Sequence, residues 1–143
     1  MSIKPYLRRH ITLGETFHFQ RNYELLNELE GSDYRAWMKS TYHLSDEEFI
    51  WMIAIDGKER NGWINSWQGE KIIERYVGGR PEPSNLYEGF NDKQRIVFEK
   101  CNNGHERYFI FRGIFQIEDG SSPTHRVLHL ISKECSSFLR FSR

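Results

Sequence analysis

Residues 108–132 read YFIFRGIFQIEDGSSPTHRVLHLIS, and this stretch decides the fold class. An aromatic and β-branched segment passes an Arg-Gly step, crosses a polar loop at residues 120–123, and returns as an apolar segment. Aromatic and β-branched residues favour strands, and a polar connection with Gly and Pro between two such runs is typical of a hairpin. We therefore predict paired strands over residues 107–117 and 126–131. Gly113, inside the first of them, indicates a β-bulge or a close backbone approach.

The chain before this hairpin predicts further strands and one helix. Apolar residues recur at helical spacing over residues 22–29, with Asn22 as the expected N-cap and Gly31 after the last turn. Residues 49–55 (FIWMIAI) form a short apolar run before Asp-Gly, which predicts a strand buried on both faces. The remaining expected strands are residues 11–19 (bent at Gly14), 63–67, 71–77 (a hairpin turning at Gln68-Gly69) and 95–101.

Two segments leave alternatives open. Residues 34–41 fit a short helix or an irregular connection, and the tail from Glu134 fits a short helix or an edge strand. Six or seven strands, joined mostly by hairpins, predict an α+β fold. We expect a small, mostly antiparallel β-barrel with one or two short helices, because closing a sheet removes its exposed edges.

Size and composition place the chain among globular proteins. A length of 143 residues fits one domain, residues 1–143. Lys plus Arg equals Asp plus Glu at 20 each, which argues against non-specific coating of nucleic acid. Two cysteines exclude a disulfide-dense scaffold, and no apolar stretch fits a signal peptide or a membrane span. We expect a cytoplasmic protein without membrane contact.

The first candidate binding surface lies on residues 63–67. Trp63, Asn65 and Trp67 alternate along one strand, so their side chains share a face. Two indoles beside an amide suit a planar ligand, because the rings stack on it and the amide reads its polar edge. The alternative is structural: one Trp packs in the core and the other covers the hairpin.

Three arginines are further candidates. Arg75 and Arg80 flank Gly78-Gly79 at the start of the long Gly- and Pro-rich loop 78–90, and could hold a phosphate. Arg112 stands in an apolar strand, where it needs a carboxylate, a carbonyl or a ligand as partner. Strict alternation places Arg112 with Tyr108, Ile110 and Ile114, opposite Phe109, Phe111, Phe115 and Ile117. A structural ion pair is the other explanation for Arg112.

No pattern predicts a metal, a cofactor or a catalytic group. His125 and His129 have an HxxxH spacing, but they fall on a loop and a strand, and no Glu or Cys completes a ligand set. His18 and His43 are possible acid–base groups without a nucleophile that the sequence places beside them. Phosphate-loop and Rossmann glycine patterns are absent from the sequence.

Residues 108–132 also carry a family resemblance. The aromatic strand, the Arg-Gly step, the polar loop and the returning apolar strand resemble the closing hairpin of SRA-like and other PUA-like domains. These are small β-barrels that read modified or flipped nucleobases, often fused to restriction nucleases. The resemblance implies an aromatic-walled pocket for a base outside its stack, with Trp63 and Trp67 as candidate walls. The acidic base-reading residue of such pockets has no evident counterpart here, and no nuclease segment is evident.

Three functions follow from the sequence. The favoured one is a non-catalytic module that binds a nucleobase, nucleotide or nucleic acid with a modified base. The second is a protein-interaction factor, such as an inhibitor or accessory subunit of a phage or defence system, which the surplus of aromatics and the neutral charge would suit. The third is a small enzyme acting on nucleotides with His18 or His43 as base.

Overall fold

The computed structural model describes residues 10–37, 39–78, 86 and 88–135, which form one helix and two sheets. The strands, in chain order, are β1 (Ile11–Thr12), β2 (Thr16–Phe17), β3 (Thr41–His43), β4 (Glu48–Ile53), β5 (Glu59–Arg60), β6 (Trp63–Gln68), β7 (Lys71–Tyr76), β8 (Gln94–Asn102), β9 (Arg107–Ile117), β10 (His125–Ser132) and β11 (Glu134–Cys135). The helix α1 spans Asn22–Glu30. Within these ranges no helix has the length and apolarity that crossing a membrane requires.

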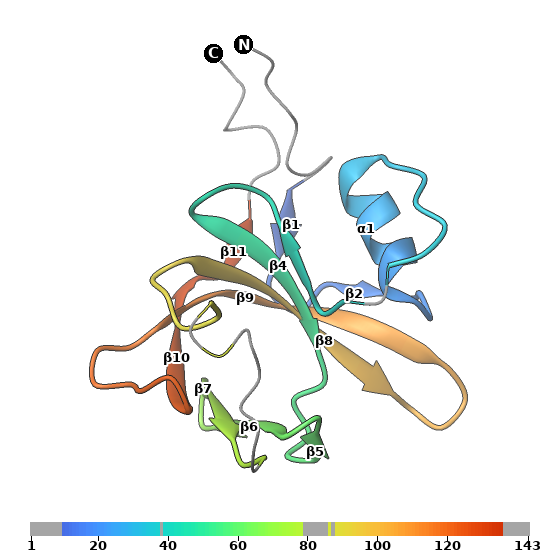
Figure 1. The fold of residues 1–143 in the computed structure, drawn as a ribbon. Helices are drawn as coiled ribbons and strands as arrows, with labels where there is room; N and C mark the ends of the chain where they lie inside the picture. The colour runs from blue at the N-terminus through green and yellow to red at the C-terminus, as the bar shows by residue number, and fades with distance from the viewer. Residues whose placement is uncertain (1–9, 38, 79–85, 87, 136–143) are drawn as a thin grey trace, which may run out of the picture.

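The large sheet curls through the molecule in the order β3-β4-β8-β9-β10-β7-β6-β5, and β2 pairs with β9 (Figure 1). Its pairings are antiparallel except for β4 with β8, which run parallel from Glu48 beside Gln94 to Ile53 beside Glu99. The curl makes a half-barrel, so the predicted α+β fold with a mostly antiparallel, barrel-like sheet is confirmed. Strands β1 and β11 form a separate two-stranded sheet that joins the two ends of the described chain.

Helix α1 forms where its apolar spacing predicts. Leu25, Leu26 and Leu29 are buried, and Gly31 ends the helix in the left-handed conformation. Arg21, not Asn22, occupies the N-cap, because the Asn22 amide is used elsewhere and donates to the Lys39 carbonyl at 3.0 Å.

The sheet has a core on each face. Helix α1 covers one core, with Ile50, Ile96 and Phe98 from the two parallel strands beneath it. The other core, toward β6, β7 and β10, contains Phe49, Trp51, Ile72, Val97, Phe115 and Leu128. Figure 1 shows α1 and strands β5–β7 on opposite sides of β4 and β8. Strand β4 is therefore buried on both faces, as its unbroken apolar run predicts.

A bulge at Gly113 changes which residues of β9 share a face. Val97 pairs with Gly113 and the next residue, Phe98, pairs with Phe111, so Arg112 is the extra residue. Strict alternation therefore fails here: Phe111 and Ile114 lie in the core beneath α1, whereas Phe115 lies in the other core. Gly113 has a φ of +107°, and a side chain there would meet Leu130 and the Ser132 carbonyl oxygen. The predicted bulge and close approach are both present.

Smaller differences concern short elements. The expected strand at residues 11–19 is two short strands, because Gly14 turns the chain with a φ of +88°. The β6–β7 hairpin turns at Gly69-Glu70, one residue later than expected, since Gln68 still pairs with Lys71. Residues 34–37 contain no helix, and the tail begins as the edge strand β11. Most of loop 78–90 falls outside the described residues.

Candidate functional site

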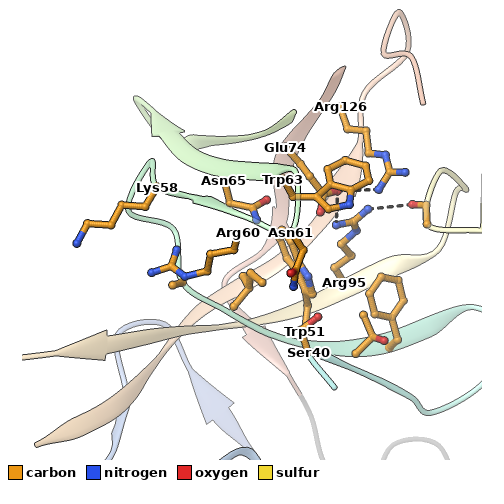
Figure 2. Close-up of a pocket in the computed structure, with 15 residues that line it drawn as sticks. Ser40, Trp51, Lys58, Arg60, Asn61, Trp63, Asn65, Glu74, Arg95 and Arg126 are labelled. Carbon is orange, nitrogen blue, oxygen red and sulfur yellow. Dashed lines mark hydrogen bonds and ion pairs between the residues drawn. The ribbon is translucent and has the colours of Figure 1, made fainter. Parts of the chain in front are cut away.

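A cavity of about 450 Å³ opens between β4 and β8 on one side and β5, β6, β7 and β10 on the other (Figure 2). This volume is within the range of small-molecule sites. Its lining residues are Ser40, Thr41, Phe49, Trp51, Ile53, Ala54, Lys58, Arg60, Asn61, Trp63, Asn65, Glu74, Gly89, Arg95 and Arg126. Aromatic rings, amides and paired charges thus meet at one place, contributed by strands far apart in the sequence.

A buried ion triad forms one wall of the cavity. Arg95 Nη1 and Arg126 Nη1 both donate to Glu74 Oε1, at 3.0 and 2.9 Å. All three residues are buried, so each charge depends on the others for compensation. Burial lowers the pKa of Arg126, and the negative charge of Glu74 acts in the opposite direction. Glu74 is consequently committed to the two arginines (Figure 2).

Each arginine of the triad also packs against an indole. The Arg95 guanidinium carbon lies 4.6 Å from the Trp51 ring centroid, and that of Arg126 lies 4.5 Å from Trp63. Such stacking fixes the orientation of both partners and places a positive charge behind an aromatic wall. Trp63 is braced further by Tyr76, whose ring centroid is 5.1 Å away.

The same guanidinium groups hold the end of the long loop. Arg95 Nη2 donates to the Gly89 carbonyl at 2.9 Å, and Arg126 Nη2 donates to the Leu86 carbonyl. At the start of the loop, the Gly78 backbone N–H donates to the Gly62 carbonyl at 3.1 Å. The loop is therefore attached at both ends to residues that surround the cavity.

Asn65 presents a buried polar atom toward the cavity. It is 7% exposed, lines the cavity, and pairs across the hairpin with Glu74. Its Oδ1 is buried and accepts no hydrogen bond from the described part of the chain. A buried amide oxygen without a donor costs stability, so a ligand that supplies the donor is favoured.

The turn at the mouth of the cavity is held by an ion pair. Arg60 forms a two-pronged ion pair with Asp56, both bonds at 2.8 Å, and Asp56 Oδ1 also accepts from the Lys58 backbone at 3.0 Å. The Arg60 guanidinium holds the pKa of the Asp56 carboxyl well below its usual range. Lys58 and Asn61 complete this turn, and Asn61 adopts a left-handed φ of 54°.

The structure brings together only part of the candidate set from the sequence. Trp63 and Asn65 line the cavity, whereas Trp67 packs at 6.0 Å from Phe115, centroid to centroid, and is not among the lining residues. Arg112 Nε donates to Glu99 at 2.7 Å, outside the cavity, in an ion pair of the kind the sequence allowed. Arg75 does not line the cavity either. Its neighbour on β7, Glu74, does.

Other candidates lie elsewhere. Arg80 falls outside the described residues. His18 is exposed and lies 3.4 Å from Glu106, while the His43 ring lies 5.5 Å from Phe49. Among residues 10–37, 39–78, 86 and 88–135, no group of three His, Cys, Asp or Glu side chains is arranged to hold a metal.

Sequence reasoning missed Trp51, Glu74, Arg95 and Arg126. The signal for the last three was the one applied to Arg112: a charge in an apolar strand needs a partner. Trp51 was assigned to a strand buried on both faces. Nothing in the local sequence distinguishes an indole that borders a cavity from one that only packs in the core.

The comparisons with known proteins concern the family and the fold. The family model of the SET and RING associated (SRA) domain matches residues 6–136. No curated protein matches the sequence. Among solved structures, the chain is similar to the 5-hydroxymethylcytosine-specific restriction enzyme AbaSI, with a TM-score of 0.68 and 19% identity over 90% of this chain. The chain spans 42% of the length of that enzyme. At 19% identity, the similarity shows a shared fold and no more. With nearly all its residues matched by the family model, this chain belongs to the SRA domain family.

Proposed function

We propose that the cavity between β4, β6, β7, β8 and β10 binds one nucleobase that DNA presents outside its helical stack. The observation that carries the proposal is Asn65, a buried amide whose Oδ1 lacks a partner, inside a cavity that two indoles border. Proteins that act on or read a single base commonly take it from the stack, stack it on aromatic side chains and read its polar edge.

The cavity supplies each of these functions from different residues. Trp51 and Trp63 offer rings, and the guanidinium groups of Arg95 and Arg126 hold those rings in place. Asn65 offers one acceptor and one donor side by side, which matches a base edge with an adjacent amino group and ring nitrogen. Because Glu74 is already bound by two arginines, the amide of Asn65 takes the role of edge reader in this proposal.

A modified cytosine is the first ligand to test. Cytosine presents the N4 amino group as donor beside N3 as acceptor, so it satisfies both atoms of the Asn65 amide. The similar solved structure belongs to an enzyme specific for 5-hydroxymethylcytosine. DNA cleavage is not part of this proposal.

The test is binding of duplex oligonucleotides that differ in one central cytosine: unmodified, 5-methyl or 5-hydroxymethyl. We expect the chain to bind one modified duplex at least tenfold more tightly than the unmodified one. Asn65→Asp keeps the shape of the side chain but exchanges its donor for an acceptor, which weakens the hold on the N3/N4 edge that all three cytosines share, a bidentate contact worth about 1–3 kcal/mol. The preference should be lost with it, because the cavity can read the 5-substituent only while it holds the base.

Ser66→Ala is the matched control, since Ser66 is the next residue on β6 and does not line the cavity. Trp63→Ala should weaken binding of all modified duplexes, whereas Trp67→Ala should retain the preference. Equal affinity for the three duplexes would contradict the proposal. A search for a protein partner would then follow.

A further inference from the structure

A second cavity, of about 460 Å³, lies on the other face of the sheet, beside the start of α1. It is lined by Gln20, Arg21, Asn22, Tyr23, Arg35, Ala36, Trp37, Lys100 and Arg107. Three separate parts of the fold contribute: the start of the helix, the connection after it, and the β8–β9 hairpin. None of these residues belongs to the first cavity.

The charge of this second cavity is entirely of one sign. Arg21, Arg35, Lys100 and Arg107 line it, and no Asp or Glu does. Across residues 10–37, 39–78, 86 and 88–135, none of the four makes an ion pair, whereas Arg60, Arg95, Arg112 and Arg126 all do. A chain with equal numbers of acidic and basic residues thus gathers four uncompensated cations at one concave place.

Lys100 shows that these cations are not simply dispersed in solvent. It is partly buried on β8, with its Nζ 6.0 Å from the Phe109 ring centroid. Burial lowers the pKa of Lys100, and the charges of Arg107 and Arg60 lower it further. A lysine that loses hydration among like charges is stabilised by an anion that enters its cavity.

We propose that this second cavity binds a phosphate group through Arg21, Arg35, Lys100 and Arg107. Arginine forks and a lysine ammonium are the side chains that proteins use to hold phosphate oxygens. The phosphate comes from a nucleic-acid backbone or from a free phosphate monoester. Binding of a nucleic-acid phosphate rests on the proposed function, whereas binding of a free phosphate monoester does not.

The two cavities share one electrostatic contact, between Arg60 and Lys100. Arg60 lines the mouth of the first cavity, and its charge reaches Lys100 in the second. Phosphate contacts of this kind position a nucleic-acid backbone without reading its sequence.

The experiment compares the native chain with the double variant Lys100→Gln/Arg107→Gln in two arms. The first arm titrates inorganic phosphate and adenosine monophosphate at constant ionic strength and follows thermal stability. The second measures duplex affinity against salt concentration. For a backbone phosphate, we expect the slope of log affinity against log salt to fall by about 2 in the double variant, about one for each lost cation.

The matched control is Lys71→Gln/Lys133→Gln, which removes the same charge from exposed positions outside both cavities. A phosphate-induced thermal shift that only Lys100→Gln/Arg107→Gln abolishes, with an unchanged salt slope, would assign the site to a free phosphate monoester. Identical behaviour of the native chain and both double variants in both arms would overturn the proposal.

Failure here is distinguishable from failure of the base-reading proposal. Asn65→Asp should lose the preference for a modified base and retain the salt slope. Lys100→Gln/Arg107→Gln should weaken binding of modified and unmodified duplexes by the same factor.

Discussion

At the scale of single residues, Asn65 is where stability and binding conflict. Its buried Oδ1 receives no hydrogen bond within the described part of the chain, so the free protein bears the cost of desolvating it. That cost is about 1–3 kcal/mol for an unsatisfied buried group. An apolar side chain of similar size would remove this cost and, under the proposed function, the recognition of the base as well.

Asn65→Leu is therefore expected to raise the free energy of unfolding by about 1 kcal/mol and to abolish preference for a modified base. Urea unfolding and duplex binding measure the two effects on the same preparation. A variant that is destabilised while it keeps the preference would show that Asn65 has a structural role only.

Glu74 is the residue on which the cavity wall depends. Glu74→Gln leaves the guanidinium groups of Arg95 and Arg126 buried without a counter-charge, and we expect it to cost about 3–5 kcal/mol. Glu118→Gln is the control, because its ion pair with Lys71, at 2.7 Å, is partly exposed and worth about 1 kcal/mol or less. Equal losses in the two variants, measured by denaturant unfolding, would contradict the role assigned to the triad.

Among single residues, what the sequence could predict depended on the range of the interaction. Trp63 and Asn65 were identifiable because alternation along one strand places them on one face. The pairing of Glu74 with Arg95 and Arg126 was not, because these contacts join β7, β8 and β10, which are separated along the chain. No local pattern specifies which carboxylate meets which guanidinium.

At the scale of elements, the bulge at Gly113 determines which side chains of β9 face each core. Gly113→Ala would place a methyl group against Leu130 and the Ser132 carbonyl, in a backbone conformation that alanine rarely adopts. Gly104→Ala is the control, because Gly104 also has a positive φ, +93°, but has open space around it. We expect Gly113→Ala to lower the free energy of unfolding by at least about 1 kcal/mol more than Gly104→Ala. Equal losses of stability in the two variants would mean that the contact with Leu130 and Ser132 adds nothing to the cost of a side chain at position 113.

The turn at the mouth of the first cavity gives a prediction about pH. Arg60 holds the pKa of Asp56 below its ordinary value of 3.8, so the pair stabilises the fold above that value and is lost as the pH falls below it. The difference in urea midpoint between the native chain and Asp56→Asn should be largest near pH 7 and shrink below about pH 4. Asp119→Asn, in the exposed β9–β10 loop, should show no such trend. A constant difference for Asp56→Asn would exclude the ion pair as the cause.

Helices and strands were predictable where they are long enough to show a periodic or compositional pattern. Helix α1 and the long strands follow from spacing and composition. Strands β1, β2, β3, β5 and β11 have two or three residues each, too few for periodicity to show. The faces of β9 were assigned wrongly beyond Gly113, because a bulge shifts alternation by one residue.

At the scale of the whole molecule, the pairing of β1 with β11 brings the two ends of the described chain together. Ile11 is fully buried and pairs with Cys135, and the Leu13 backbone N–H donates to the Lys133 carbonyl at 2.9 Å. The curled sheet is thus joined by residues more than a hundred positions apart. Composition and strand number predicted the curl, but nothing in the sequence specified this closing pair.

Ile11→Ala should cost about 2–5 kcal/mol in denaturant unfolding, because it leaves a cavity where β1 meets the core beneath α1. Leu13→Ala, in the same segment, removes a side chain that is 45% exposed and should change stability by less than about 0.5 kcal/mol. Similar effects of the two substitutions would mean that β1 contributes little to the fold.

The attachment of the long loop has a consequence for engineering. Gly78 is fixed to Gly62, and the carbonyls of Leu86 and Gly89 are fixed to Arg126 and Arg95. These three contacts use backbone groups of the loop, so they do not depend on which side chains the loop carries. Under the proposed function, libraries of equal length that replace residues 79–85 would keep the backbone contacts at Gly78, Leu86 and Gly89, which makes the chain a starting point for selecting readers of other chemically altered bases.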